Sequence, residues 1–144
     1  MKSNNTQEKK LRAVTGEVSQ LDWNEIIPGL NVKVLVVDEE RHSVEFLMKA
    51  DASWKPGLHR HVCETSVLVL DGTISNQNTG REYAPGSFFY QKSGNTHVEN
   101  MGEQGLYAYV NMRGTCDTLV EFLDDSRTVQ GVMNVSHFSS LLPA

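Results

Sequence analysis

Short apolar runs alternate with turn residues along most of the chain. β-Branched and aromatic residues gather in these runs, and glycine, proline or aspartate follows them within a few positions. Residues of the first kind favour strands, and residues of the second kind mark the turns between strands. We expect strands at residues 32–37, 44–48, 67–70, 88–91, 106–110 and 119–122. Several short strands of this kind predict an all-β sandwich or barrel.

The two ends of the chain depart from this pattern. Residues 1–20 are polar without a clear period and are expected to form a flexible N-terminal arm, which leaves 21–144 as the barrel domain. A short helix is expected at 135–142, stopped by Pro143, because proline cannot continue a helix. A length of 144 residues suits one domain and is short for two.

Two of the expected strands, 32–37 and 67–70, are apolar at successive positions. One face of an antiparallel sheet usually stays in contact with water, so these strands are expected between two packed sheets or at a dimer interface. A homodimer is therefore expected. In the run at 88–91, Phe88 and Phe89 are both expected in the core.

Composition and charge narrow the function classes. The formal net charge of −5 disfavours binding to nucleic acid or to an anionic membrane, because phosphate neutralisation needs a basic surface. No apolar run approaches the roughly 20 residues of a membrane-spanning helix. The N-terminus does not resemble a signal peptide, and two cysteines are too few for a disulfide scaffold. We expect a cytoplasmic protein that binds neither nucleic acid nor membrane.

Three of the five histidines fall between residues 56 and 100. His59 and His61 stand two positions apart, and alternate residues of a strand point to the same face, so their rings are expected to project together. His97 follows after a Pro85-Gly86 turn, far enough along for a hairpin to return the chain to the same end of a barrel. The three imidazoles predict a metal site; a pair of ordinary surface histidines is the alternative for His59 and His61.

The spacing of these histidines and of the neighbouring glycines resembles the two motifs of the cupin superfamily. The first motif matches at Gly57, His59, His61 and Gly72, the last of which is expected to end a strand. The second matches at Gly80, Pro85, Gly86, Gly94, His97 and Asn100. The resemblance implies a single-domain jelly-roll β-barrel with one metal ion inside it, commonly iron, manganese, nickel or zinc.

One position departs from that pattern. Many cupins supply a Glu ligand four or five residues after the second histidine, where this chain has Thr65 and Ser66. Glu64 stands one residue early and is expected to face away unless a bulge turns it inward. Cys63 shares the face of the histidines and is either a buried apolar residue or a thiolate ligand. We expect three neutral imidazoles to form the ligand set, with Glu64 or Cys63 as the candidate fourth ligand.

Glu99 lies two residues after His97 and is expected on the same face. It would either accept a hydrogen bond from a ligand ring and so orient it, or be a solvated carboxylate at a strand end. The sequence leaves both alternatives open.

Within the cupins, the Leu21-Asp22-Trp23 segment and the Leu58-His59-Arg60-His61 segment resemble small acetylacetone-cleaving and dihydroxyacetophenone dioxygenases. That resemblance implies an iron(II) dioxygenase that uses O2 to cleave a carbon–carbon bond of a small diketone or hydroxyacyl compound. The strand at 67–70 also resembles the cupin domain of zinc anti-sigma factors. The alternative function is therefore a non-catalytic cupin that binds or senses a metal or small molecule. An isomerase or hydrolase with a Lewis-acid metal is a third.

Overall fold

The computed structural model describes residues 11–142, which form two antiparallel β-sheets and one short α-helix. The larger sheet contains β1 (Leu11–Ala13), β2 (Asn24–Ile27), β3 (Leu30–Asp38), β4 (Ser43–Ala50), β6 (Glu64–Asn76), β7 (Glu82–Tyr83), β8 (Phe88–Gln91) and β10 (Glu99–Arg113). The smaller sheet contains β5 (His59–His61), β9 (Thr96–His97), β11 (Thr118–Leu123) and β12 (Val129–Asn134). All six strands expected from the sequence are present, so the prediction of an all-β fold is confirmed.

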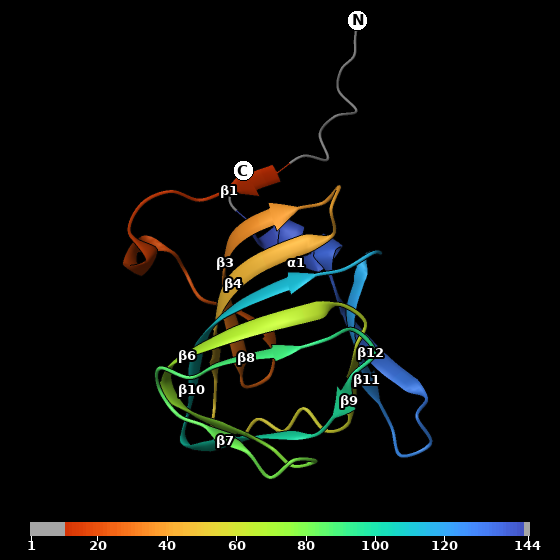
Figure 1. The fold of residues 1–144 in the computed structure, drawn as a ribbon. Helices are drawn as coiled ribbons and strands as arrows, with labels where there is room; N and C mark the ends of the chain where they lie inside the picture. Colours follow the sequence, from red (N-terminus) through yellow and green to blue (C-terminus); the bar gives the residue numbers. More distant parts are fainter. Residues whose placement is uncertain (1–10, 143–144) are drawn as a thin grey trace, which may run out of the picture.

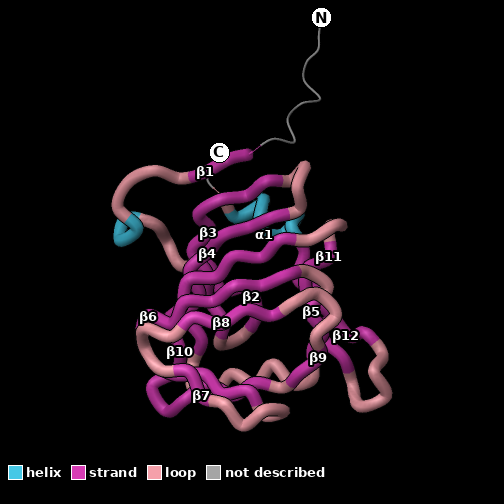
Figure 2. Tube along the Cα trace, in the orientation of Figure 1, coloured by secondary structure: helices cyan, strands magenta, loops and turns pink. Residues whose placement is uncertain are grey.

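The strand order shows that the chain crosses repeatedly between the two sheets. In the larger sheet the order is β1-β3-β4-β10-β6-β7, with β2 bonded to β3 and β8 bonded to β6. In the smaller sheet it is β12-β11-β5-β9. Figure 1 shows the long strands side by side, with β9, β11 and β12 grouped at one side of them, and Figure 2 shows how little of the described chain is helical. One core joins the inward faces of both sheets.

The strand β6 continues through Asp71-Gly72, a dipeptide that is typical of turns. Gly72 was expected to end a strand, yet β6 continues to Asn76 with a register shift beside Gly72. Gly72 has a φ of +73°, and a Cβ there would overlap the carbonyl oxygen of Gly105. The glycine therefore makes a bulge that lets two backbones approach closely, rather than a turn.

The strand β3 is buried on both sides, as its apolar sequence predicted. Val32 faces the core, while the outward-facing Lys33 is only 7% exposed. The Lys33 ammonium donates to the carbonyl of Val18 at 3.1 Å and lies 4.8 Å from the centre of the Trp23 ring. The chain's own N-terminal segment thus covers the outer face of β3.

The strands β6 and β8 have one buried and one exposed face. Val67 and Val69 point into the core, whereas Leu68 and Leu70 are exposed. Residues 67–70 therefore do not lie between two packed sheets of the described chain, and the alternative of a dimer interface stays a prediction. Phe88 was also expected in the core, but it is 63% exposed; only Phe89, one residue later, is buried. Strand alternation places adjacent residues on opposite faces, so both phenylalanines could not enter the same core.

The helix α1 (Val135–Leu141) lies where the sequence predicted it. The Asn134 side chain accepts a hydrogen bond from the backbone N–H of His137, which caps the first turn. The Phe138 ring stacks on Phe46 of β4 with the ring centres 4.7 Å apart. No helix among the described residues is long and apolar enough to span a membrane.

The expected N-terminal arm is partly built into the sheet. Leu11–Ala13 pair with the edge of β3, and a 3-10 turn forms at Val18–Gln20. Residues 1–10 of the expected arm lie outside the described residues. Residues 11–20, which composition assigned to the arm, are therefore part of the described fold.

Candidate metal centre

Two short strands of the smaller sheet place the three histidines. His59 and His61 are the first and last residues of β5, so strand alternation turns both rings to the inner face, where both are buried. β9 pairs with β5 in an antiparallel register that sets His97 directly opposite His59. The pairing of β5 with β9 thus brings together histidines that are far apart in the sequence.

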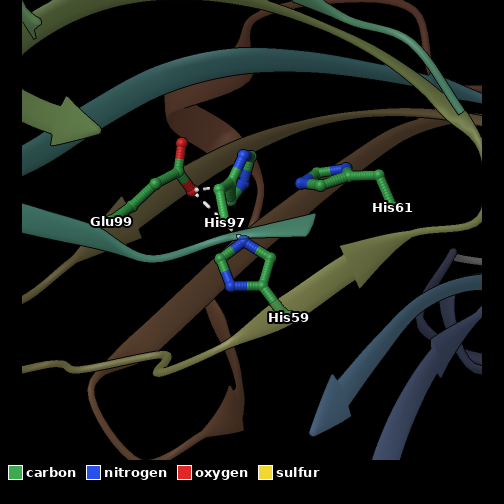
Figure 3. A group of neighbouring side chains, drawn as sticks. All are labelled: His59, His61, His97 and Glu99. Atoms are coloured by element: carbon green, nitrogen blue, oxygen red, sulfur yellow. Dashed lines mark ion pairs between the residues drawn. The ribbon is translucent and has the colours of Figure 1, made fainter. Parts of the chain in front are cut away.

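Four side chains converge inside the barrel. His59, His61, His97 and Glu99 each offer one ligand atom, and these atoms all lie within 4.8 Å of one another. Figure 3 shows the three rings and the carboxylate turned toward a common centre, with Glu99 reaching in from the adjacent start of β10. The sequence expectation that the three histidines project together is met by this geometry, and Glu99 joins them.

The outer nitrogens of two rings are held by hydrogen bonds. His59 Nδ1 lies 2.9 Å from the carbonyl oxygen of Gly57, which can only accept, so the ring proton sits on Nδ1. His61 Nδ1 lies 2.9 Å from the Thr65 hydroxyl. Both contacts fix the ring orientation and turn Nε2 toward the centre of the group.

The Nε2 atoms that face the centre of the group have few hydrogen-bond partners. His61 Nε2 is buried without a hydrogen-bond partner in the described chain. His59 Nε2 lies 3.3 Å from Glu99 Oε1, and a neutral ring protonated on Nδ1 presents a lone pair there. Two acceptors at that distance need a cation between them, either a proton or a metal ion.

The charge state of the group suits a cation. Burial of Glu99 by itself would raise its pKa. In the metal-free protein a proton takes the place between the acceptors, and the resulting hydrogen bonds with His59 and His97 outweigh burial and hold the pKa of Glu99 well below its usual range. Burial lowers the pKa of His61 to about 3, with further lowering by His59 and His97 against an opposing effect of Glu99. At neutral pH His61 is therefore a neutral imidazole and Glu99 an anion, the protonation states that metal binding requires.

Gln91 completes the surroundings of the group. This buried residue of β8 has its Nε2 atom 3.2 Å from Glu99 Oε2 and 3.3 Å from His97 Nδ1. The amide therefore donates to the carboxylate oxygen that faces away from the histidines. The sequence pattern predicted no role for Gln91 or Thr65. The signal for Gln91 was its position on the same face of its strand as Phe89, which placed a polar side chain in the core.

The two candidates for a fourth ligand lie elsewhere. Glu64 is exposed, and its carboxylate accepts a hydrogen bond from the Tyr90 hydroxyl at 2.7 Å. No bulge turns it inward, because β6 keeps regular register there. Cys63 is buried with its Sγ 3.5 Å from the Thr65 hydroxyl, and burial raises the pKa of its thiol. It is absent from the ligand group of the described residues and remains a neutral thiol at neutral pH.

The position of Glu99 decides between the two alternatives that the sequence left open for this residue. Its side chain is only 12% exposed and lies within 3.4 Å of ring nitrogens of both His59 and His97. It is therefore not a solvated carboxylate at a strand end. The carboxylate that many cupins place on the strand after the second histidine comes here from a different strand, beside the third histidine.

A small apolar cavity of about 70 Å³ adjoins His59, His61 and Glu99. At about 10–15 Å³ for each water-sized probe, it holds a molecule of roughly five to seven non-hydrogen atoms. All four methionines of the described chain line it: Met48, Met101, Met112 and Met133. Trp54 is another lining residue. Polar groups gather at the end beside His59, His61 and Glu99, so a ligand that fits would have a polar head and an apolar body.

Solved structures share this fold over most of the chain. An RmlC-like cupin protein from Ralstonia eutropha has 19% sequence identity and a TM-score of 0.76, over 89% of this chain and 84% of the other. An acetylacetone dioxygenase from Acinetobacter johnsonii has 15% identity and a TM-score of 0.72, over 98% of this chain and 97% of the other. At these identities the likeness shows the fold alone. No curated protein sequence matches the chain at a significant level.

A family model covers most of the described chain. The model of the ChrR cupin-like domain matches residues 11–115, which include all of the larger sheet and the four residues of the ligand group. The match begins at β1, the first of the described strands. This protein belongs to the ChrR cupin-like domain family of the cupin superfamily.

Proposed function

We propose that His59, His61, His97 and Glu99 bind one divalent metal ion, with iron(II) the favoured metal. The observation that carries this proposal is the pair of nitrogens of His61: Nδ1 is fixed by Thr65, while Nε2 is buried without a partner. A buried polar atom without a partner costs about 1–3 kcal/mol, and a metal ion at the centre of the group would remove that cost. Imidazole and carboxylate ligands suit iron, zinc, nickel and manganese alike.

The second part of the proposal is the reaction. We propose that the metal-loaded protein is a dioxygenase that cleaves a carbon–carbon bond of a small 1,3-diketone or hydroxyacyl compound. For a diketone and one O2, the products are a carboxylic acid and a 2-oxoaldehyde, which together contain both atoms of oxygen. No external reductant is needed. The overall likeness to an acetylacetone dioxygenase supports this reaction class, and the size of the cavity supports a small substrate.

Electrostatics favour a substrate that binds as a monoanion. A divalent ion, supplying Lewis acidity and an O2-reactive centre when bound, carries two positive charges, of which Glu99 neutralises one. An enolate would neutralise the other, and a neutral complex costs least to bury in a cavity with apolar walls. The side chains of Met112 and Val110 would then pack against the apolar part of the substrate, while Gln91 keeps Glu99 in place.

The metal assignment is tested by metal content. Untagged protein, reconstituted with iron(II) under anaerobic conditions, should hold about one ion per chain by plasma mass spectrometry. His59→Ala, His97→Ala and Glu99→Gln should each lose most of it. Glu64→Gln is the matched control, because this exposed carboxylate contacts Tyr90 and not the histidines. Full metal content in the His97→Ala variant would contradict the ligand assignment.

The reaction is tested by oxygen uptake. Iron-loaded protein should consume O2 only when a chelating diketone is added, and the His97→Ala variant should not. Stable metal binding with a ligand-dependent rise in melting temperature, but without turnover of any carbonyl compound, would contradict the dioxygenase and favour the alternative of a binding or sensing cupin. Turnover without O2 consumption would favour an isomerase or hydrolase.

A further inference from the structure

Four apolar side chains form a continuous surface on the outside of the larger sheet. They are Leu68, Leu70, Phe88 and Tyr90, here called the β6–β8 face, and all are exposed. Leu68 stands directly opposite Phe88 in the strand ladder, and Ser66 stands opposite Tyr90. Leu68 and Phe88 are opposite neighbours, Tyr90 is a diagonal neighbour of Leu68, and Leu70 is a diagonal neighbour of Phe88. Opposite and diagonal neighbours are within reach of aromatic side chains, so the four form one patch and not isolated exposed residues.

The strand β3 is also apolar at successive positions, but its outer face is covered. There the outward side chain, Lys33, lies under Val18 and Trp23 of the chain's own N-terminal segment. Among residues 11–142, no segment performs this role for the β6–β8 face: Phe88 is 63% exposed and Tyr90 is 52% exposed. The strand β8 is also bonded to β6 on one side without a described strand on its other side. An aromatic face beside an open strand edge is unfavourable in water unless something covers it.

The charges at the ends of this face differ in sign. At one end, Arg113 lies 3.6 Å from Glu64, and the exposed Lys92 directly follows β8; together these three groups carry a net charge of about +1. At the other end of the β6–β8 face, directly after Leu70, stands the exposed Asp71. A two-fold axis that crosses β6 near Leu68 would place the basic end of one copy over the acidic end of the other. A partner of one charge sign would instead meet a like charge at one end.

We propose that the β6–β8 face is a two-fold interface with a second copy of this chain. In such an isologous interface the aromatic side chains form the centre, where buried Tyr and Phe contribute most to affinity, and the charged ends form the rim. Since Val67 and Val69 alternate with Leu68 and Leu70 and point to the opposite side of the sheet, dimerisation leaves the metal group undisturbed.

Analytical ultracentrifugation over a range of protein concentrations tests the interface. The wild type should sediment as a dimer, and Phe88→Glu should raise the dissociation constant at least about 30-fold, because it buries a charge at the centre of the interface. Val129→Glu, in another exposed apolar position on β12, should leave the dimer unchanged. A wild type that is monomeric at every concentration overturns the proposal. So does a dimer that survives both Phe88→Glu and Leu70→Lys.

A charge exchange tests the orientation of the two copies. Asp71→Lys should weaken the dimer by placing positive charge at both ends of the face, and adding Lys92→Asp should restore it. Failure of restoration overturns the two-fold arrangement. Metal content and melting curves of each variant, measured alongside, report on folding and on the metal group separately. A loss of the dimer with unchanged metal content therefore concerns this interface alone.

Discussion

The hydroxyl of Thr65 lies 2.9 Å from Nδ1 of His61, and both residues are buried. Thr65 stands where many cupins place a carboxylate ligand. In this chain it fixes the ring of a candidate ligand instead of contacting a metal, and the carboxylate is supplied by Glu99 from β10. The candidate site thus combines three imidazoles with one carboxylate, but this carboxylate comes from a different strand than in many cupins.

Thr65→Val should weaken metal binding about 10- to 100-fold, because the isosteric side chain removes the hydrogen bond that orients His61. Thr65→Ser keeps the hydroxyl and should bind metal nearly as well as the wild type. Competition with a chromogenic chelator measures both affinities. Equal loss in the two variants would indicate a packing effect, and no loss in either would show that the contact does not matter.

Acid should destabilise the metal-free protein. The pKa of His61 is about 6.5 in the unfolded chain and about 3 in the folded protein, where the ring is buried. Between these two pH values the unfolded state therefore binds more protons than the folded state. The low pKa of Glu99 acts in the same direction at lower pH. The free energy of unfolding should therefore fall by up to about 1.4 kcal/mol per pH unit below pH 6.5 from His61 alone.

Urea unfolding in the presence of a chelator, at several pH values from 7.5 downward, measures this dependence. In His61→Gln the contribution of the ring is absent, and the slope below pH 6.5 should become shallower. A free energy of unfolding that stays constant or rises on acidification would contradict the assigned neutral state of His61.

Gly72→Ala should destabilise the protein by at least about 2 kcal/mol. The new methyl group would overlap the carbonyl oxygen of Gly105, and the φ of +73° is one that alanine rarely adopts. Gly131→Ala is the control, since a Cβ at that position meets open space. Thermal unfolding compares the two. Similar melting temperatures would mean that the bulge in β6 can relax at little cost.

Val67→Phe should block ligand binding while leaving metal content unchanged. Val67 lines the cavity, and the larger side chain would fill space that a substrate needs, at a cost in stability of about 1–3 kcal/mol. Met112→Leu, a change of similar volume in the same wall, should retain binding. The ligand-dependent rise in melting temperature measures both. An unchanged response in Val67→Phe would place the ligand outside this cavity.

The local sequence determined where the six main strands and the helix form and which histidines share a face. The β-branched runs and turn residues sufficed for the six main strands, because these preferences act over a few residues. The spacing of His59 and His61 fixed their common face for the same reason. The match of glycine and histidine positions to the cupin motifs supplied the rest of the fold class, and the family model confirms it.

Only the tertiary structure decided which groups meet and which faces remain uncovered. Glu99 joins His59 because β9 pairs with β5 in one register and the chain then enters β10, and no local pattern encodes that pairing. Lys33 is buried because the segment around Val18 packs over the outer face of β3. Leu68 is exposed because none of the described residues covers it on the outer face of β6. Apolar alternation tells which side chains share a face, but only long-range packing tells which face becomes the core.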